Sequence, residues 1–361
     1  MHNTFRKERS DEKLHATLTE ENCRRTRMND LFNYGYNGIS EKLPEGQIPG
    51  RIVEVRREIY KVVCSHGEVT ASLRGAFFHR TEERGNYPAV GDFVLMKHNG
   101  SGPSSIVDLL PRTSKFSRTD FSGHAAAYVK TVLEQVVAAN FDYVFIVSSL
   151  NRDFNAGRIA RYLTQARQSG GVPVVILTKA DLCEDAATHI AAVREIAPDI
   201  DVIALSSHTG VGLGELNQYV RPGKTIVFLG MSGVGKSSLL NALAGENLMD
   251  VKEIREEDSR GRHTTTHRQL VRLPSGAMII DTPGMRELGL WDAGEGIDAA
   301  FADIEAIIAR CRFSDCRHQT ESGCAVKAAL ADKTLPEKHW KSYLAQKNEA
   351  DFVSRRTRRR G

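Results

Sequence analysis

Hydrophobic and polar positions follow two different patterns in the N-terminal and central parts of the chain. Between residues 48 and 110, short runs of β-type residues are separated by turn residues such as His66 and Gly67. This spacing predicts about five short strands in a small β-barrel, of which the oligonucleotide-binding (OB) fold is one common type. Such a barrel can bind nucleic acid or only support its neighbour, and the pattern leaves both interpretations open.

From residue 129 onward, apolar runs of strand length alternate with helical patterns. We expect strands at residues 143–147, 173–177, 202–205, 225–229 and 278–280, and helices at 156–169, 186–196 and 338–353. This alternation predicts a parallel sheet covered by helices on both faces. The fold class expected is therefore α/β, with the small barrel before it and a helical segment after it.

Composition excludes some classes of protein. The 361 residues are enough for two or three domains, and 41% hydrophobic content is ample for their cores. The net charge of +4 is too small to indicate nucleic-acid binding by itself. The most apolar region, 132–150, contains Glu134 and Asp142, and no apolar stretch follows the basic first residues. We therefore expect no membrane span and no secretory signal, and a cytoplasmic protein.

A phosphate-binding motif starts at Gly230. The segment Gly230-Met-Ser-Gly-Val-Gly-Lys-Ser237 fills every fixed position of the P-loop pattern, between an apolar strand and a helix-compatible run. Its glycines let backbone amides surround phosphate groups, and the helix N-terminus adds a favourable dipole. Lys236 should reach the β- and γ-phosphates, and Ser237 should ligate Mg²⁺.

The base specificity is indicated by Thr178-Lys-Ala-Asp181, which ends an apolar strand. Asp181 can accept hydrogen bonds from both N1–H and the exocyclic amino group of guanine, whereas adenine offers no such donor pair. The aliphatic part of Lys179 can lie over the base. Ser206 begins a plausible second loop on the base side. The sequence thus predicts a site for GTP rather than ATP.

Two further segments complete the expected site. Asp281-Thr-Pro-Gly284 follows an apolar strand, where an aspartate can hold Mg²⁺ through water and a glycine amide can contact the γ-phosphate. A threonine-rich segment, 262–267, lies between the P-loop and Asp281, as a switch segment would. One of its threonines should close on Mg²⁺ when GTP is bound, and we select Thr265. An ordinary polar loop is the alternative.

The order of these motifs is unusual. In an ordinary GTPase the base motif follows the P-loop, whereas here Thr178 to Asp181 precede Gly230. A parallel sheet permits such a permutation, because each motif needs only the end of its own strand. The residues predicted to contact nucleotide are Thr178, Lys179, Asp181, Ser206, Gly230, Met231, Ser232, Gly233, Val234, Gly235, Lys236, Ser237, Ser238, Asp281 and Gly284.

Three of the six cysteines lie close together with a histidine. The spacing Cys311-x4-Cys316-x-His318-x5-Cys324 supplies three thiolates and one imidazole, a complete tetrahedral set for structural zinc. It differs from the commonest Cys-x2-Cys spacing, so a group of free thiols stays open on spacing alone.

Taken together, these motifs and their order resemble the circularly permuted, ribosome small-subunit-dependent GTPase A family, over roughly residues 48–340. The resemblance implies an OB barrel, a permuted GTPase domain and a zinc domain that uses the cysteine cluster. It also implies binding to the small (30S) ribosomal subunit and its rRNA, a role in late maturation of that subunit, and stimulation of hydrolysis by it. Thr178 departs from the asparagine that is common in the family.

The residue after Gly284 bears on catalysis. Met285 stands where many GTPases have a glutamine that orients the attacking water, and a thioether cannot do so. We therefore expect slow intrinsic hydrolysis that needs an external element. His263 is the best internal candidate to position water, with contact to RNA or solvent as the alternative. Lys236 and Thr265 complete the predicted catalytic set.

Candidate RNA contacts occur in the barrel and the tail. Five arginines lie between Arg355 and Arg360, and such runs bind phosphates with strong salt dependence. A solvated end is the alternative. The barrel adds basic residues and the pair Phe77 and Phe78, which are either core or stacking residues.

We expect four segments: a mobile arm at 1–46, the barrel at 47–112, the permuted GTPase domain at 113–292, and a helical zinc domain with basic tail at 293–361. The leading interpretation is a monomeric enzyme that uses GTP with Mg²⁺ and carries structural Zn²⁺. A GTP-gated RNA-binding module, and an ATPase or nucleotide kinase, are the alternatives; turnover with small subunits and ATP competition distinguish them.

Overall fold

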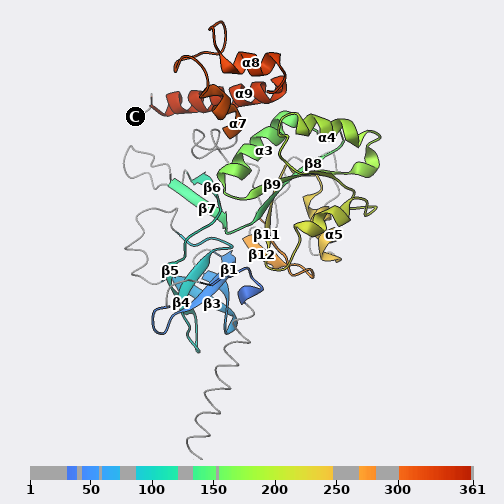
Figure 1. The fold of residues 1–361 in the computed structure, drawn as a ribbon. Helices are drawn as coiled ribbons and strands as arrows, with labels where there is room; N and C mark the ends of the chain where they lie inside the picture. Colours follow the sequence, from blue (N-terminus) through green and yellow to red (C-terminus); the bar gives the residue numbers. More distant parts are fainter. Residues whose placement is uncertain are drawn as a thin grey trace, which may run out of the picture.

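The computed structural model describes residues 31–38, 43–56, 59–73, 87–120, 133–151, 154–246, 268–281 and 301–358. Three parts follow one another along the molecule: a barrel at one end, an α/β sheet in the middle and a helical part at the other end (Figure 1). The helices and strands that the sequence predicts between residues 143 and 353 are present in the expected order, together with others that it did not predict.

The barrel consists of five strands, as the short β-type runs and the turn residues between them predict. They are β1 (Ile48–Arg56), β2 (Ile59–Cys64), β3 (Gly67–Leu73), β4 (Phe93–Lys97) and β5 (Ser104–Leu109). Their order is β1-β2-β3-β5-β4, and β4 pairs again with β1, which closes the barrel. Residues such as Ile52, Val62 and Met96 fill its interior and are fully buried.

Five parallel strands form the central sheet in the order β10-β9-β8-β11-β13. They are β8 (Tyr143–Ser149), β9 (Val172–Thr178), β10 (Val202–Ala204), β11 (Thr225–Leu229) and β13 (Met278–Asp281). All five were predicted from the sequence. Because parallel strands point the same way, the P-loop and the base motif leave the sheet at the same edge.

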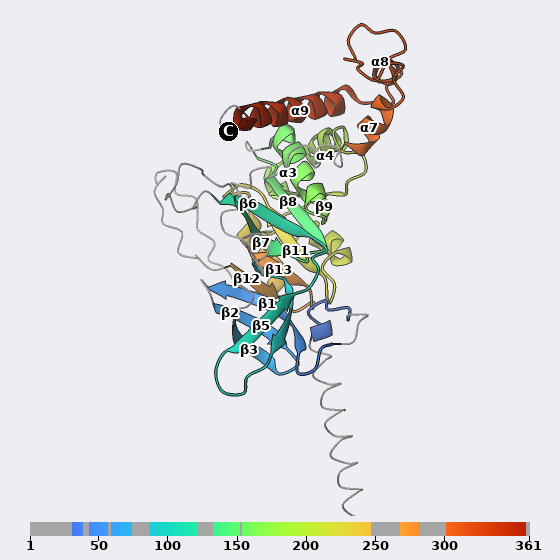
Figure 2. The same ribbon diagram turned by 90° about the vertical axis from the view of Figure 1, so that its left-hand side faces the viewer.

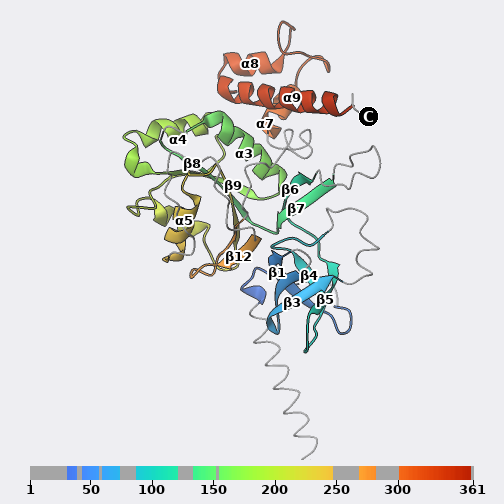
Figure 3. The same ribbon diagram turned by 180° about the vertical axis from the view of Figure 1, so that it is seen from behind.

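Helices cover both faces of this sheet, as Figure 3 shows from behind. The helices α3 (Ala156–Gln168) and α4 (Ala186–Arg194) contribute to one core, and α5 (Lys236–Ala244) contributes to the other. Alternate residues of β8 explain this division, since Val144 and Ile146 belong to the first core and Phe145 and Val147 to the second. Every second residue of a strand faces the same side of a sheet.

One edge of the sheet departs from the parallel arrangement that the sequence predicts. The strand β12 (Arg268–Arg272) runs antiparallel to β13, because a tight turn joins the two strands and such a hairpin can only produce antiparallel pairing. Gly276 forms this turn with φ +81°. β12 also pairs with β1, opposing Glu54 to Gln269, so that one sheet of eleven strands runs from the α/β part into the barrel.

Two further strands were not predicted. β6 (Lys115–Asp120) and β7 (Leu133–Ala139) form a separate antiparallel pair beside the central sheet. The segment from Leu31 to Tyr36 packs against the barrel strand β4, since Leu31 and Tyr36 are buried and the rings of Tyr36 and Phe93 lie 5.5 Å apart. The rest of the predicted arm lies largely outside the described residues.

The C-terminal part contains α7 (Ala302–Ile308), α8 (Ala325–Ala331) and α9 (Glu337–Arg358). α9 lies along α3, and the hydroxyl of Thr164 donates to the Gln346 side-chain oxygen at 2.6 Å (Figure 2). No helix in the described ranges is long and apolar enough to cross a membrane.

Candidate nucleotide site

The P-loop connects β11 to α5 and depends on its glycines. Gly230 has φ +150°, and a Cβ there would lie 2.4 Å from the Val147 carbonyl oxygen. Gly235 has φ +98° and precedes the first residue of α5, Lys236. Only glycine adopts these conformations without strain, and the resulting loop leaves its backbone amides beside a helix N-terminus. This arrangement is suited to binding phosphate groups.

The ammonium group of Lys236 lies on the P-loop itself. Its Nζ donates to the carbonyl oxygens of Gly230 at 2.7 Å and Met231 at 2.5 Å. A lysine placed at the base of the loop puts a positive charge where the phosphates of a bound nucleotide would lie. Met231, Ser232 and Gly233 are exposed and form the outer part of the loop.

Thr178 holds the base motif against the P-loop. Its side chain is buried, and its hydroxyl lies 2.5 Å from the carbonyl oxygen of Val234 and 3.3 Å from that of Ser148. Residue 178 and the P-loop are more than fifty residues apart in the chain, yet one hydrogen bond joins them. The threonine hydroxyl therefore tethers the two loops where the resemblance to the family led us to expect an asparagine amide.

The Thr178→Val variant tests this tether. We expect nucleotide affinity to fall about 5- to 100-fold, because the buried Val234 carbonyl then lacks a donor at a cost of about 1–3 kcal/mol. Titration of a fluorescent GDP analogue measures the change. Thr178→Ser, which keeps the hydroxyl, should bind close to the wild type. Equal affinities of the valine and serine variants would contradict the proposed role.

Asp181 is oriented by a neighbouring loop. The hydroxyl of Ser206 donates to its carboxylate, and this hydrogen bond is the main cause that lowers the pKa of Asp181. Ser206 is buried, and its oxygen accepts from the backbone N–H groups of His208 and Thr209, both at 3.2 Å. Ser206 therefore acts through Asp181, holding an ionised acceptor at the exposed edge of the sheet.

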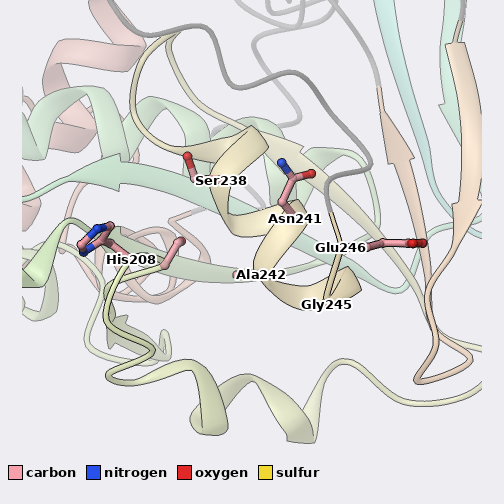
Figure 4. A pocket seen from close by; sticks show the side chains of 7 residues that line it. His208, Ser238, Asn241, Ala242, Gly245 and Glu246 are labelled. Atoms are coloured by element: carbon pink, nitrogen blue, oxygen red, sulfur yellow. The ribbon is translucent and has the colours of Figure 1, made fainter.

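A cavity of about 500 Å³ lies between this loop and α5 (Figure 4). Ser207 and His208 line one side, and the other side is formed by residues of α5 and its C-terminal end, including Ser238 and Asn241. Neither Lys179 nor Asp181 lines this cavity, so it lies beside the predicted base site and does not itself define that site. His208 belongs to the loop that the sequence predicted on the base side, whereas Asn241 was not predicted to line a site.

Part of the predicted site lies outside the described residues. This applies to His263, Thr265 and Gly284, and to the side chain of Asp281. The backbone of Asp281 ends β13, whose neighbour β11 leads into the P-loop in parallel register, with Val227 opposite Ile280. Asp281 therefore leaves the sheet at the same edge as Lys236.

The predicted metal ligands converge in the C-terminal part. The ligand atoms of Cys311, Cys316, His318 and Cys324 all lie within 4.8 Å of one another. The Sγ atoms of Cys311 and Cys324 are 4.0 Å apart, and His318 Nδ1 lies 3.6 and 3.5 Å from them. A tetrahedral zinc ion with Zn–S bonds of about 2.3 Å requires ligand separations of roughly 3.5–3.8 Å. The separations among Cys311, His318 and Cys324 are close to this range, and Cys316 lies near enough to complete a set of four zinc ligands.

Backbone amides favour a thiolate in this cluster. Burial alone would raise the pKa of the Cys311 thiol, but the N–H groups of Val326 and Ala325, at the start of α8, outweigh it and the pKa is lowered. Burial and the neighbouring thiols instead raise the pKa of Cys316 to about 11. These hydrogen bonds thus favour Cys311 as a thiolate ligand.

The fold and the arrangement of motifs define a P-loop GTPase of circularly permuted type. Residues 94–291 match the model of the RsgA GTPase family. The chain is 42% identical to "Small ribosomal subunit biogenesis GTPase RsgA 2" of Lactiplantibacillus plantarum, over 85% of this chain and 84% of the relative. It is also 42% identical to "Small ribosomal subunit biogenesis GTPase RsgA 1" of Listeria innocua, over 90% of this chain and 91% of the relative.

Solved structures agree with this. YjeQ from Thermotoga maritima has a TM-score of 0.64 and 26% identity, covering 84% of this chain and 98% of that one. YloQ, described as a circularly permuted GTPase, has a TM-score of 0.62 and 25% identity, covering 87% and 99%. The chain therefore belongs to the RsgA GTPase family, whose members are GTP-hydrolysing enzymes.

Proposed function

We propose that this GTPase binds the small ribosomal subunit and its rRNA, assists late maturation of the subunit, and hydrolyses GTP faster when bound to it. The names of relatives that cover most of the chain support the choice of partner. The observation that carries the nucleotide assignment is the hydrogen bond from Thr178 to the Val234 carbonyl, since it brings the guanine motif and the phosphate loop to one place.

Each residue of the site has a proposed role. Backbone amides from Gly230 to Gly235, with Ser238 at the start of α5, surround the phosphates, and Lys236 neutralises the β- and γ-phosphates. Lys179 and Asp181 hold the guanine. Ser237, Thr265 and Asp281 hold Mg²⁺, which neutralises charge on the phosphates when bound. The amide of Gly284 contacts the γ-phosphate.

Hydrolysis by the isolated protein should be slow. Met285 cannot orient water, so we assign that task to His263 together with an element of the subunit. Both residues lie outside the described ranges, and the assignment depends on the sequence. Replacing His263 with alanine should reduce subunit-stimulated turnover.

The remaining parts of the chain are assigned to attachment. We propose boundaries at residues 46, 112 and 292 between arm, barrel, GTPase domain and zinc domain. In the described part of the barrel, Arg56 and Lys61 form ion pairs with Glu54. RNA binding is assigned to the barrel and the arginine-rich tail, in a cytoplasmic monomer.

A GTP turnover assay titrated with isolated small ribosomal subunits tests the function. Stimulation in related switches reaches about 10³- to 10⁵-fold. We expect a saturable increase that disappears in Lys236→Ala, which removes the phosphate-binding ammonium group. Turnover that is independent of small subunits would contradict the proposal, and large subunits serve as the control.

We assign structural Zn²⁺ to the cysteine cluster. The purified wild type should contain one zinc ion per chain, whereas Cys324→Ser should contain little, because a tetrahedral site loses one of its four ligands. Metal analysis and limited proteolysis of the C-terminal part measure the change. Cys183→Ser is the matched control, since Cys183 lies outside the cluster. Full zinc content in Cys324→Ser would contradict the assignment.

A further inference from the structure

The loop between the first two cysteines of the cluster exposes an aromatic ring. Phe313 is 44% exposed, although phenylalanine is among the residues most often fully buried. The guanidinium group of Arg312 lies over its ring, 5.5 Å from the ring centroid. An arginine in this position forms a cation–π contact and adds a second flat surface beside the ring.

The position of Phe313 is set by the protein itself. Its carbonyl accepts from the Cys316 N–H at 3.3 Å, and the Arg312 N–H donates to the Gly323 carbonyl at 3.2 Å. Glu321 accepts from the N–H groups of Arg317, Gln319 and Thr320 at 2.8–3.0 Å. These bonds fix the loop on both sides of the ring, so Phe313 is presented to solvent by a defined backbone.

The surroundings of this ring are positively charged. Four cations in or next to the loop are exposed: Arg310, Arg312, Arg317 and Lys327. In the parts of the chain that the structure describes, no carboxylate forms an ion pair with any of these four side chains. Asp315 is the only acidic residue between 310 and 318. Few carboxylates of the chain therefore compete with an anionic partner for these four cations.

We propose that Phe313 and Arg312 form a stacking site for an unpaired base of ribosomal RNA, with the neighbouring cations on its phosphates. The ring of Phe313 and the flat guanidinium group of Arg312 match the π-face of an unpaired base. The neighbouring cations match the phosphate backbone of single-stranded RNA. Arginines that form no ion pair with a carboxylate can bind phosphates, whereas contact with an apolar protein surface would desolvate their charges without compensation. This inference depends on the proposed binding to the small subunit and names one of its contacts.

Substitutions at Phe313 separate stacking from simple apolar contact. We expect Phe313→Ala to weaken binding of the full-length protein to isolated small subunits about 5- to 100-fold, the range for loss of one stacked base. Phe313→Leu keeps the apolar volume but has no π-face and should be equally weak, whereas Phe313→Trp should bind like the wild type. Val172→Ala is the control, since Val172 is 55% exposed at the start of β9, outside the parts of the chain that are assigned to attachment.

Salt dependence and fluorescence provide independent readouts. Arg310→Gln should reduce the salt slope of binding by about one, and Phe313→Ala should leave it unchanged. A short single-stranded RNA that contains 2-aminopurine should be quenched by the wild type and not by Phe313→Ala. Zinc content verifies that each variant is folded.

The outcomes are distinguishable from failure of the proposed function. If the wild type does not bind small subunits, the proposed function itself fails. If the wild type binds and Phe313→Ala binds equally well, only the stacking site is wrong. If Phe313→Leu binds like the wild type while Phe313→Ala is weak, the ring contacts an apolar protein surface and the RNA assignment is overturned.

Discussion

Asp181→Asn is expected to lose GTP and to gain xanthosine triphosphate. The carboxylate accepts two hydrogen bonds from guanine, each worth about 1.5–3 kcal/mol because the acceptor is charged, so GTP affinity should fall roughly 10²- to 10⁴-fold. The asparagine amide can donate to the 2-oxo group of xanthine while its oxygen accepts from N1–H. The Ser206 hydroxyl holds residue 181 in position for either base.

Competition of GTP, xanthosine triphosphate and ATP against a fluorescent GDP analogue measures this exchange. Asp185→Asn is the matched control, since Asp185 lies four residues away and caps α4 by accepting from the Thr188 N–H, which asparagine can also do. Unchanged GTP affinity in Asp181→Asn would remove Asp181 from the base site.

A second large effect is expected from Arg112→Met, at the junction of barrel and sheet. Arg112 donates to both carboxylate oxygens of Asp92, at 2.8 and 2.7 Å, and the Asp92 side chain is completely buried. Removing one member of a buried ion pair leaves an uncompensated charge, which costs about 3–5 kcal/mol. We expect the free energy of unfolding to fall by this amount at pH 7.

The pH dependence of this loss gives a further signature. Burial already raises the pKa of Asp92, and Arg112 counteracts that increase. A carboxyl group with a raised pKa holds more protons in the folded state, so its folded state loses stability as pH rises through the interval between the unfolded and folded pKa values. Without Arg112 the pKa of Asp92 in the folded state rises further, so the interval between the unfolded and folded pKa values widens. The difference from the wild type should therefore shrink as pH is lowered, as urea unfolding at several pH values would show.

Asp92→Asn combined with Arg112→Met is the control. The double variant lacks both members of this ion pair, so it should be more stable than Arg112→Met alone, and the double-mutant cycle gives the coupling between the two side chains. If the free energy of unfolding of Arg112→Met fell by less than about 1 kcal/mol at every pH, the proposed role of the Arg112–Asp92 ion pair would be contradicted.

The motifs of the candidate nucleotide site could be identified from the sequence because they are local. A P-loop needs a strand, its glycines and a helix within one short segment, and all three can be identified in the residues around Gly230. The joining of this loop to the base motif could also be expected, since parallel strands end at one edge. The sequence could not show that the Thr178 hydroxyl makes this connection, because hydrogen bonds between residues more than fifty positions apart leave no pattern in the chain.

Contacts between the parts of the molecule were the least predictable. Arg51 occupies a polar position in an ordinary strand pattern, yet it is completely buried and donates to the carbonyl oxygens of Gly91 and Asn140. Burial lowers its pKa to about 10. β12 was missed for a similar reason: it is short, and its pairing with β1 depends on a strand more than two hundred residues earlier.

The pairing of β12 with β1 limits how the barrel can respond to the nucleotide. β12 begins directly after the predicted switch segment, and its other edge belongs to the wall of the barrel. A shift of this strand by one residue would turn each of its side chains to the opposite face of the sheet. A small rotation of the strand therefore costs less free energy than a change of its register. A small rotation near the γ-phosphate would then displace the far end of the barrel by a larger distance. The position of any RNA bound there would therefore depend on the state of the nucleotide.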